Sequence, residues 1–306
     1  MKVVIIGGLN SGRRITEYLN NDNNTELLKV YVLKDDIGNQ YSDFVTFDDI
    51  VSPEQLVKVD NINKYSEEIN QLQPDIIFVV GWSQLINDKI INSAKIGVIG
   101  FHPSKLPKDR GRSVLAWQIA EGYKVGCVSM FWIDSGVDSG NIIAQKEFKI
   151  DYEYTIREVL DKVYDICVEL VRIYYPVIMN GNIISISQDT KLATYRTKRG
   201  KKDGIINWKD SSTNIYNLIR AITFPYPGAS TFYKGNELIV LEAKEKKCHD
   251  IYKNAIPGTI LFIEHNKGIG IKTKDNIILI KKIMYKENGI MLEKVENSLK
   301  IGDVLE

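Results

Sequence analysis

Cysteine and histidine are scarce in this sequence, with three of each among 306 residues. The cysteines, Cys127, Cys167 and Cys248, are far apart and odd in number. They show no metal-ligand spacing and predict no disulfide framework, so we interpret them as reduced structural thiols. We expect no metal site.

Long apolar runs are also missing. No uninterrupted hydrophobic stretch reaches the length needed to cross a bilayer. The first residues, MKVVIIGG, lead straight into a strand-like segment, without the apolar region and cleavage site of a secretory leader. We therefore expect a cytoplasmic protein that does not bind membranes.

An excess of charge of either sign is absent as well. Lysine and arginine number 40 and aspartate and glutamate 39, so the formal net charge is +1. No overall field would then draw a nucleic acid or an anionic membrane to the protein. The hydrophobic fraction of 44% and the charged fraction of 26% are ordinary for a soluble globular protein, and the length suits two domains.

The first half of the chain alternates strand-like and helical segments. Apolar runs predict strands at residues 3–6, 27–33, 76–80 and 97–101, with helices at 11–19, 65–72 and 87–94. The continuous apolar run at 3–6 is typical of a strand buried on both faces. Together with the alternation of strands and helices, it predicts a mainly parallel, Rossmann-like sheet with helices on both faces.

The second half has a different pattern. Apolar residues at helical spacing predict a long helix over 156–179, and the polar stretch 196–203 resembles a linker. A helix at 212–222 is followed by short strands with glycine and asparagine turns, which is typical of a small β-rich, OB-like domain. We predict a catalytic domain over 1–195 and a C-terminal domain over 204–306.

His102 directly follows a predicted strand, in the segment Gly-Phe-His-Pro-Ser-Lys-Leu-Pro-Lys-Asp-Arg-Gly that ends at Gly111. Open α/β sheets bind their ligands at the carboxyl ends of their strands. Taken alone, His102 is explained equally well as a ligand-binding residue or as a histidine that packs at the end of a strand.

A second segment, Ile133-Asp-Ser-Gly-Val-Asp-Ser-Gly140, places two carboxylates and two glycines in a turn after a strand-like run. Such residues also form ordinary turns. A carboxylate that reached His102 would instead fix its tautomer, as in acid/base pairs.

Together the two segments resemble the formyltransferase family that includes methionyl-tRNA, glycinamide-ribonucleotide and sugar N-formyltransferases. The family pattern is Asn-x-His-x-Ser-Leu-Leu-Pro, then Arg-Gly, then Asp-x-Gly-x-Asp-[Ser/Thr]-Gly. The matching positions are His102, Ser104, Leu106, Pro107, Arg110, Gly111, Asp134, Gly136, Asp138, Ser139 and Gly140. The segments 74–84, 220–229 and 257–259 also resemble the family, so the likeness covers nearly the whole chain.

The resemblance implies transfer of a formyl group from 10-formyltetrahydrofolate to an amine, with His102 and Asp138 as catalytic residues. The residues it implies for the folate are Gly81, Trp82, Ser83, Gln84, Leu85, Ile133, Asp134, Gly136 and Val137. Those it implies for the acceptor substrate are Ser104, Lys105, Arg110, Gly111 and Arg112.

One position departs from the family pattern: Gly100 stands where the family has asparagine. In the family this amide is taken to help hold the developing oxyanion. Ser83, Gln84 and Ser104 are candidate replacements because they are polar and lie in loops that border the predicted site. A non-catalytic binding protein of the same fold stays an alternative.

A dinucleotide-binding oxidoreductase is a further alternative, because Gly7-Gly-Leu-Asn-Ser-Gly12 follows the first strand. The fingerprint needs glycine where Leu9 stands, so a tight strand-to-helix turn is the better interpretation.

Two branches of the family differ in their acceptor. The tRNA branch typically carries a long basic insertion after the second strand, whereas the stretch between Lys34 and Lys58 is here mainly acidic and would repel phosphates. The basic cluster from Lys198 to Lys202 favours tRNA. We expect a nucleotide-linked amino-deoxy sugar, destined for a surface glycan, rather than tRNA. The oligomeric state stays open, with a homodimer as one option.

Overall fold

The computed structural model describes residues 1–264, 267–287, 290–293 and 298–306. Within these ranges the chain forms two compact units. Unit 1 contains Met1–Val114, Val125–Lys149 and Leu160–Arg196, and unit 2 contains Leu115–Lys124, Ile150–Val159 and Thr197–Glu306.

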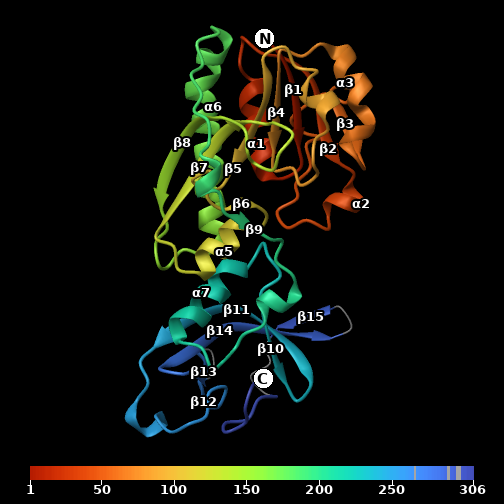
Figure 1. Cartoon of the computed structure of the whole chain (residues 1–306). Helices are drawn as coiled ribbons and strands as arrows, with labels where there is room; N and C mark the ends of the chain where they lie inside the picture. Colours follow the sequence, from red (N-terminus) through yellow and green to blue (C-terminus); the bar gives the residue numbers. More distant parts are fainter. Residues whose placement is uncertain (265–266, 288–289, 294–297) are drawn as a thin grey trace. The chain divides into compact units, whose positions relative to one another are not determined.

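Unit 1 is built on a seven-stranded sheet with the order β3-β2-β1-β4-β5-β7-β8 (Figure 1). The strands are β1 (Lys2–Gly7), β2 (Glu26–Leu33), β3 (Leu56–Val59), β4 (Ile76–Val80), β5 (Gly97–His102), β7 (Val125–Trp132) and β8 (Ile142–Lys149). The first five strands of this order are parallel, and β7 and β8 are antiparallel. The predicted mainly parallel sheet is thus confirmed.

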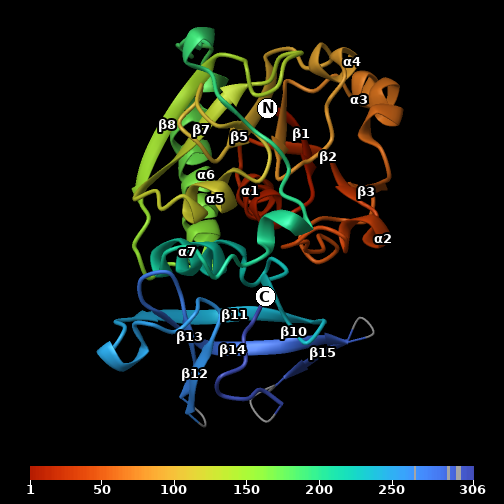
Figure 2. The same cartoon turned by 60° about the horizontal axis from the view of Figure 1, so that its bottom comes forward.

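Helices cover both faces of this sheet, as predicted (Figures 1 and 2). They are α1 (Asn10–Asn20), α2 (Asp35–Gly38), η1 (Ile62–Tyr65), α3 (Ser66–Leu72), α4 (Asp88–Ile91) and α6 (Ile156–Met179), the last with its first turn in unit 2. On one face, Ile62, Ile69 and Ile90 pack in the same buried cluster as Val79. Neighbouring strand residues point to opposite faces, so Phe78 meets Tyr175 of α6 on the other, with ring centroids 6.0 Å apart.

The glycines after β1 form the predicted tight turn into α1. A Cβ atom on Gly12 would lie 3.0 Å from the carbonyl oxygen of Val80 and 3.1 Å from the Cα atom of Gly7. Glycine therefore lets α1 approach the sheet closely, which is a packing role that needs no nucleotide.

Several elements of unit 1 were not predicted. β3 and β8 were missed, and the residue that begins the predicted linker, Arg196, instead lies in a short strand, β9 (Tyr195–Arg196). β9 pairs in parallel with β6 (Arg110–Gly111). The segment before it contains η2 (Thr190–Leu192).

Unit 2 contains the predicted small β-rich domain, with α7 (Ser212–Ile222) before it along the chain. Its strands are β10 (Ala229–Tyr233), β11 (Asn236–Lys246), β12 (Ile260–Glu264), β13 (Gly268–Lys272), β14 (Ile277–Glu287) and β15 (Ile290–Glu293). The order is β10-β11-β14-β13-β12, with β15 on β14, and all pairs are antiparallel. The shorter helices of this unit are η3 (Lys201–Gly204) and η4 (Asp250–Tyr252), and α5 (Val114–Ala120) has all but its first residue here.

The last residues of the chain connect the two outer strands of this sheet. Phe232 in β10 and Glu306 exchange two backbone hydrogen bonds of 2.9 Å. The amide of Ile260 in β12 donates to the carbonyl of Asp303 at 2.9 Å. The segment between Asp303 and Glu306 thereby closes the sheet, which fits the predicted barrel-like domain.

The cysteines differ in their surroundings. Cys127 and Cys167 are buried, and burial raises the pKa of their thiols to about 11 and about 12, whereas Cys248 is half-exposed. Because the thiolate is the reactive form, Ellman's reagent at pH 8 should modify only Cys248 in the folded protein and all three thiols in denaturant. More than one fast-reacting thiol per native chain would contradict this prediction.

Within the described ranges, no helix is both long and apolar enough to cross a membrane.

Candidate active site

His102 is the last residue of β5 and is buried, with 5% of its surface exposed. Its Nε2 atom lies 2.7 Å from the carbonyl oxygen of Asp109. A carbonyl oxygen only accepts hydrogen bonds, so Nε2 carries a hydrogen and the neutral ring has its lone pair on Nδ1. Nδ1 is therefore the nitrogen that can take up a proton.

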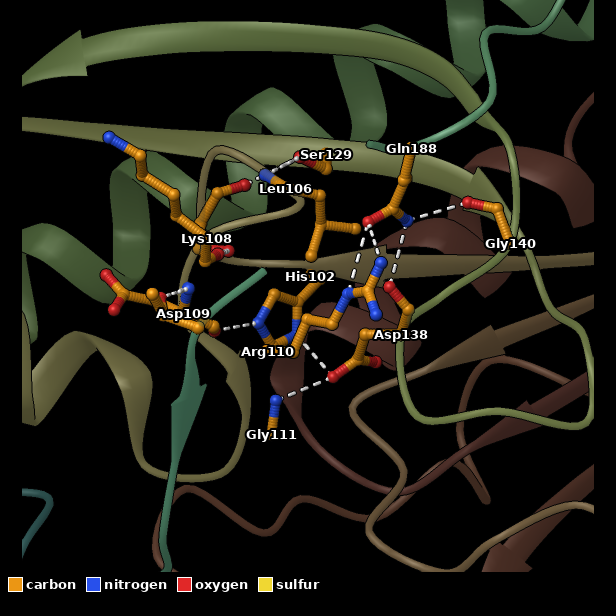
Figure 3. A network of polar contacts seen from close by, with 12 residues as sticks. His102, Leu106, Lys108, Asp109, Arg110, Gly111, Ser129, Asp138, Gly140 and Gln188 are labelled. Atoms are coloured by element: carbon orange, nitrogen blue, oxygen red, sulfur yellow. Dashed lines mark hydrogen bonds and ion pairs between the residues drawn. The ribbon is translucent and has the colours of Figure 1, made fainter. Parts of the chain in front are cut away.

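Asp138 faces this nitrogen. Its Oδ2 atom lies 3.5 Å from His102 Nδ1 and accepts a hydrogen bond of 2.8 Å from the backbone amide of Gly111 (Figure 3). The Asp138 side chain is 22% exposed, so the carboxylate is more accessible to solvent than the buried imidazole. The structure thus brings together the two residues predicted to be catalytic. A carboxylate in this place stabilises the imidazolium that forms when Nδ1 is protonated.

The loop that carries Asp138 is held by the other carboxylate of the motif. Asp134 Oδ1 accepts hydrogen bonds from the amide of Gly136 at 3.0 Å and from the hydroxyl of Ser139 at 2.7 Å. A Cβ atom on Gly136 would lie 2.0 Å from Ser139 Oγ, so a side chain there would displace this hydroxyl. Asp134 therefore shapes the turn, and Asp138 enters the site.

The loop between His102 and Arg112 is braced from within. The hydroxyl of Ser104 is buried and donates to the carbonyl of Lys108 at 2.7 Å. Lys105 is exposed and pairs with Glu147 at 2.7 Å, and Arg112 is exposed as well. Of the side chains predicted to bind the acceptor, Lys105 and Arg112 are thus at the surface, while Ser104 supports the loop.

Arg110, also predicted to bind the acceptor, is buried with only 2% of its surface exposed. Its Nε and Nη2 atoms donate to Gln188 Oε1 at 3.2 and 2.7 Å, and Nη1 donates to the hydroxyl of Tyr195 at 3.0 Å. All three guanidinium nitrogens are therefore engaged within the protein.

The two loops predicted to bind the folate lie on one face of the sheet. Trp82, in the loop after β4, and Ile133, in the loop after β7, pack against the same buried cluster. Leu85 and Val137, one from each loop, are 74% and 44% exposed. The indole nitrogen of Trp82 is buried and has no hydrogen-bond partner among the described residues.

Other side chains of the first loop maintain its shape. Gln84 accepts a hydrogen bond from the amide of Ile62 at 3.2 Å and donates to the carbonyl of Asp60 at 2.8 Å. Gly81 has a φ angle of +61°, and a Cβ atom there would lie 2.7 Å from Ser11 Oγ. Ser83 is exposed.

Gly100, where the family has asparagine, lies in the middle of β5. A Cβ atom on it would lie 3.0 Å from Cγ1 of Ile133 and 3.0 Å from two ring carbons of Phe131. Hydrocarbon side chains thus occupy the space beside Gly100. The Ser104 hydroxyl and the Gln84 amide already donate hydrogen bonds within the protein. Of the three suggested replacement donors, Ser83 is the exposed one.

Comparison with known proteins identifies the class to which this fold and site belong. A family model described as "Formyl transferase" matches residues 1–171, and one described as "Formyl transferase, C-terminal domain" matches residues 198–294. The chain therefore belongs to the formyl transferase family, as its sequence motifs predicted.

The curated relatives include two kinds of protein. A methionyl-tRNA formyltransferase of Clostridium tetani is 33% identical over 242 residues, which cover 76% of each chain. The bifunctional polymyxin resistance protein ArnA of Wigglesworthia glossinidia brevipalpis is 32% identical over 244 residues. That match covers 79% of this chain but 36% of ArnA.

Solved structures share the fold. HypX from Aquifex aeolicus, in complex with tetrahydrofolic acid, has a TM-score of 0.71 at 17% identity over 97% of this chain and 46% of its own. The N-formyltransferase of Helicobacter canadensis, with folinic acid and dTDP-3-aminofucose, has a TM-score of 0.68 at 22% identity over 92% and 98% of the two chains. The sugar 3N-formyltransferase WlaRD has a TM-score of 0.66 at 22% identity over 96% and 99%.

Sequence reasoning missed the residues that form hydrogen bonds with the Asp138 loop and with the loop between His102 and Arg112. Gln188 contacts the Asp138 loop, and Thr194 and Arg196 bind Asp109 through its amide and its carboxylate, both at 2.8 Å. These side chains lie in a segment without periodicity, so no pattern in the sequence indicated their partners.

Proposed function

We propose that this protein transfers a formyl group from 10-formyltetrahydrofolate to the amine of a nucleotide-linked amino-deoxy sugar. The observation that carries the proposal is the pair of His102 and Asp138, in which the proton-accepting nitrogen of a buried imidazole faces a carboxylate. Family membership supports formyl transfer, and the molecules bound in the HypX and Helicobacter canadensis structures support a folate donor.

The residues present fit a folate. Two loops with exposed apolar side chains, Leu85 and Val137, lie on one face of the sheet. The buried indole N–H of Trp82 offers a donor that a polar heterocycle could satisfy. When bound, the folate would supply the formyl carbon.

The chain's own residues would manage the proton of the reaction. A neutral amine that attacks a formyl carbon loses a proton, and the leaving nitrogen gains one. His102 Nδ1 can accept the first proton and return it to the second, while Asp138 stabilises the imidazolium between the two steps. The backbone carbonyl of Asp109 keeps the ring in the tautomer that this role requires.

The acidic stretch after β2 supports a sugar acceptor rather than tRNA. Asp35 and Asp48 both lie near the ammonium of Lys58, at 3.0 and 3.2 Å, and Asp49 binds Arg13 at 2.6 Å. Both cations are thus engaged by carboxylates, and the stretch has a net negative charge that would repel a phosphate backbone.

Initiator tRNA is the second candidate, for two reasons. The curated relatives include methionyl-tRNA formyltransferases at about one-third identity. In addition, Thr197–Glu306 contains 17 lysines and 2 arginines against 5 aspartates and 8 glutamates, an excess of positive charge within unit 2.

An acceptor assay distinguishes the two candidates. With 10-formyltetrahydrofolate present, tetrahydrofolate release should be fast with a nucleotide-linked amino-deoxy sugar and negligible with charged initiator tRNA at physiological salt. The same sugar with its amine already acetylated is the negative control. A higher kcat/KM for the tRNA would reject the sugar proposal.

A charge variant makes the assay sharper. If tRNA were the acceptor, replacing Lys198, Lys201 and Lys202 by Glu would strongly lower kcat/KM for this polyanion. We expect kcat/KM for the sugar nucleotide to change by less than about threefold, because few phosphates are involved.

A further inference from the structure

We propose that Gln188 is a positioning residue that holds Asp138 beside His102, with buried Arg110 fixing its orientation. The inference rests on the proposed catalytic role of the pair. It assigns Arg110 to the support of the site in place of the substrate contact suggested by the sequence.

The amide nitrogen of Gln188 reaches both ends of the short segment that carries the carboxylate. It donates to the carbonyl of Asp138 at 2.9 Å and to the carbonyl of Gly140 at 2.7 Å (Figure 3). A glutamine amide has two hydrogens, and both are used here.

Arg110 determines which end of the Gln188 amide faces this segment. Its Nε and Nη2 atoms donate to Gln188 Oε1, and a guanidinium can only donate. The oxygen must therefore face Arg110 and the nitrogen must face the two carbonyls. A flip of the amide would leave both sides with mismatched groups.

Asp138 needs such support because of its backbone. Its φ angle is +49°, in the left-handed region that costs a non-glycine residue about 1 kcal/mol or more. The four residues before it, 134–137, are exposed. The Gln188 hydrogen bonds to the carbonyls of Asp138 and of Gly140, at and just after this strained position, hold the carboxylate at the distance it has from His102.

A merely structural role would predict different behaviour. If Gln188 only satisfied the buried charge of Arg110, Gln188→Glu would preserve that contact and strengthen it with an ion pair. The same variant places a carboxylate oxygen against two carbonyl oxygens, so a positioning role predicts a loss of function although the contact with Arg110 is kept.

The first experiment compares Gln188→Glu with the wild type. We expect kcat to fall about tenfold to a hundredfold, the cost of moving a reacting group by ~1 Å, while KM for folate and acceptor changes little. The thermal midpoint should stay close to that of the wild type, because the new ion pair with Arg110 offsets the two lost hydrogen bonds. The matched control is Gln73→Glu, since Gln73 is exposed and donates to the carbonyl of Asn70 at 2.8 Å. A kcat within twofold of the wild type for Gln188→Glu would overturn the proposal.

A second readout needs no substrate. The ring nitrogens of His102 can be followed by NMR, because the chain has only three histidines and His102→Asn assigns the signals. We expect Gln188→Glu to change the chemical shifts of these nitrogens, as Asp138→Asn does by removing the facing carboxylate, and Gln73→Glu to leave them unchanged. Unchanged chemical shifts in Gln188→Glu would refute the positioning role. Absent formyl transfer in the wild type together with changed chemical shifts in Gln188→Glu would refute the proposed function alone.

Discussion

Replacing His102 by asparagine is expected to lower kcat by about a hundredfold or more, the usual range for a lost acid/base group. Asp138→Asn should have a similar effect, because the neutral amide no longer stabilises an imidazolium at Nδ1. Since Asp138 acts through His102, the double variant should cost little more than either single change. Steady-state kinetics on the three variants measures this coupling.

The controls separate chemistry from folding. His249→Asn changes an exposed histidine in unit 2 and should leave kcat unchanged. Folate affinity and the thermal midpoint of the site variants should stay near the wild-type values, since both substitutions roughly preserve size. Near wild-type turnover in either single variant, or fully additive losses in the double variant, would exclude the pair as the reacting unit.

Restoring the family asparagine at Gly100 is expected to damage the protein instead of improving it. The new Cβ atom would press on Ile133 and Phe131 at 3.0 Å, and overpacking of a filled core costs about 1–3 kcal/mol in the free energy of unfolding. Thermal or denaturant unfolding of Gly100→Asn measures the loss. We expect no gain in kcat, because the amide would contact the side chains of Ile133 and Phe131 and not a substrate.

Two companion variants identify the cause. Gly100→Ala adds only the Cβ atom, so it should reproduce much of the destabilisation if the contact at Cβ is its cause. Adding Ile133→Ala to Gly100→Asn should recover part of the stability by removing Cγ1. A stable and more active Gly100→Asn would show that the space beside Gly100 is open to an amide.

The sequence pattern was sufficient for the elements whose residues are buried on both faces or on one regular stripe. β4 and α7 have the predicted bounds, and so does α6 with its long apolar stripe. β8 was missed because its second half, Gln145–Lys149, is mostly polar and its burial alternates only weakly at the edge of the sheet. β3 was missed because it has four residues, one of them Lys58.

The candidate site was predictable only where the residues form motifs. His102 and Asp138 lie in segments that resemble a family pattern, and the structure places them together. Gln188 and Arg110 could not be paired in advance, because a buried polar contact depends on the tertiary arrangement and leaves no periodicity in the chain. The same reason explains why the filling of the space beside Gly100 by Phe131 and Ile133 was not foreseen.

The short pairing of β6 with β9 sets a limit on how this protein could exchange modules with its relatives. Residues 172–197 lie between the two regions that match family models, yet Gln188, Thr194 and Arg196 hold both loops that flank His102. A recombination joint placed at the end of the first matched region would separate the imidazole from its supports. Joints after Arg196 would keep them, so a chimera that exchanges the C-terminal domain should be joined within the few residues that follow β9.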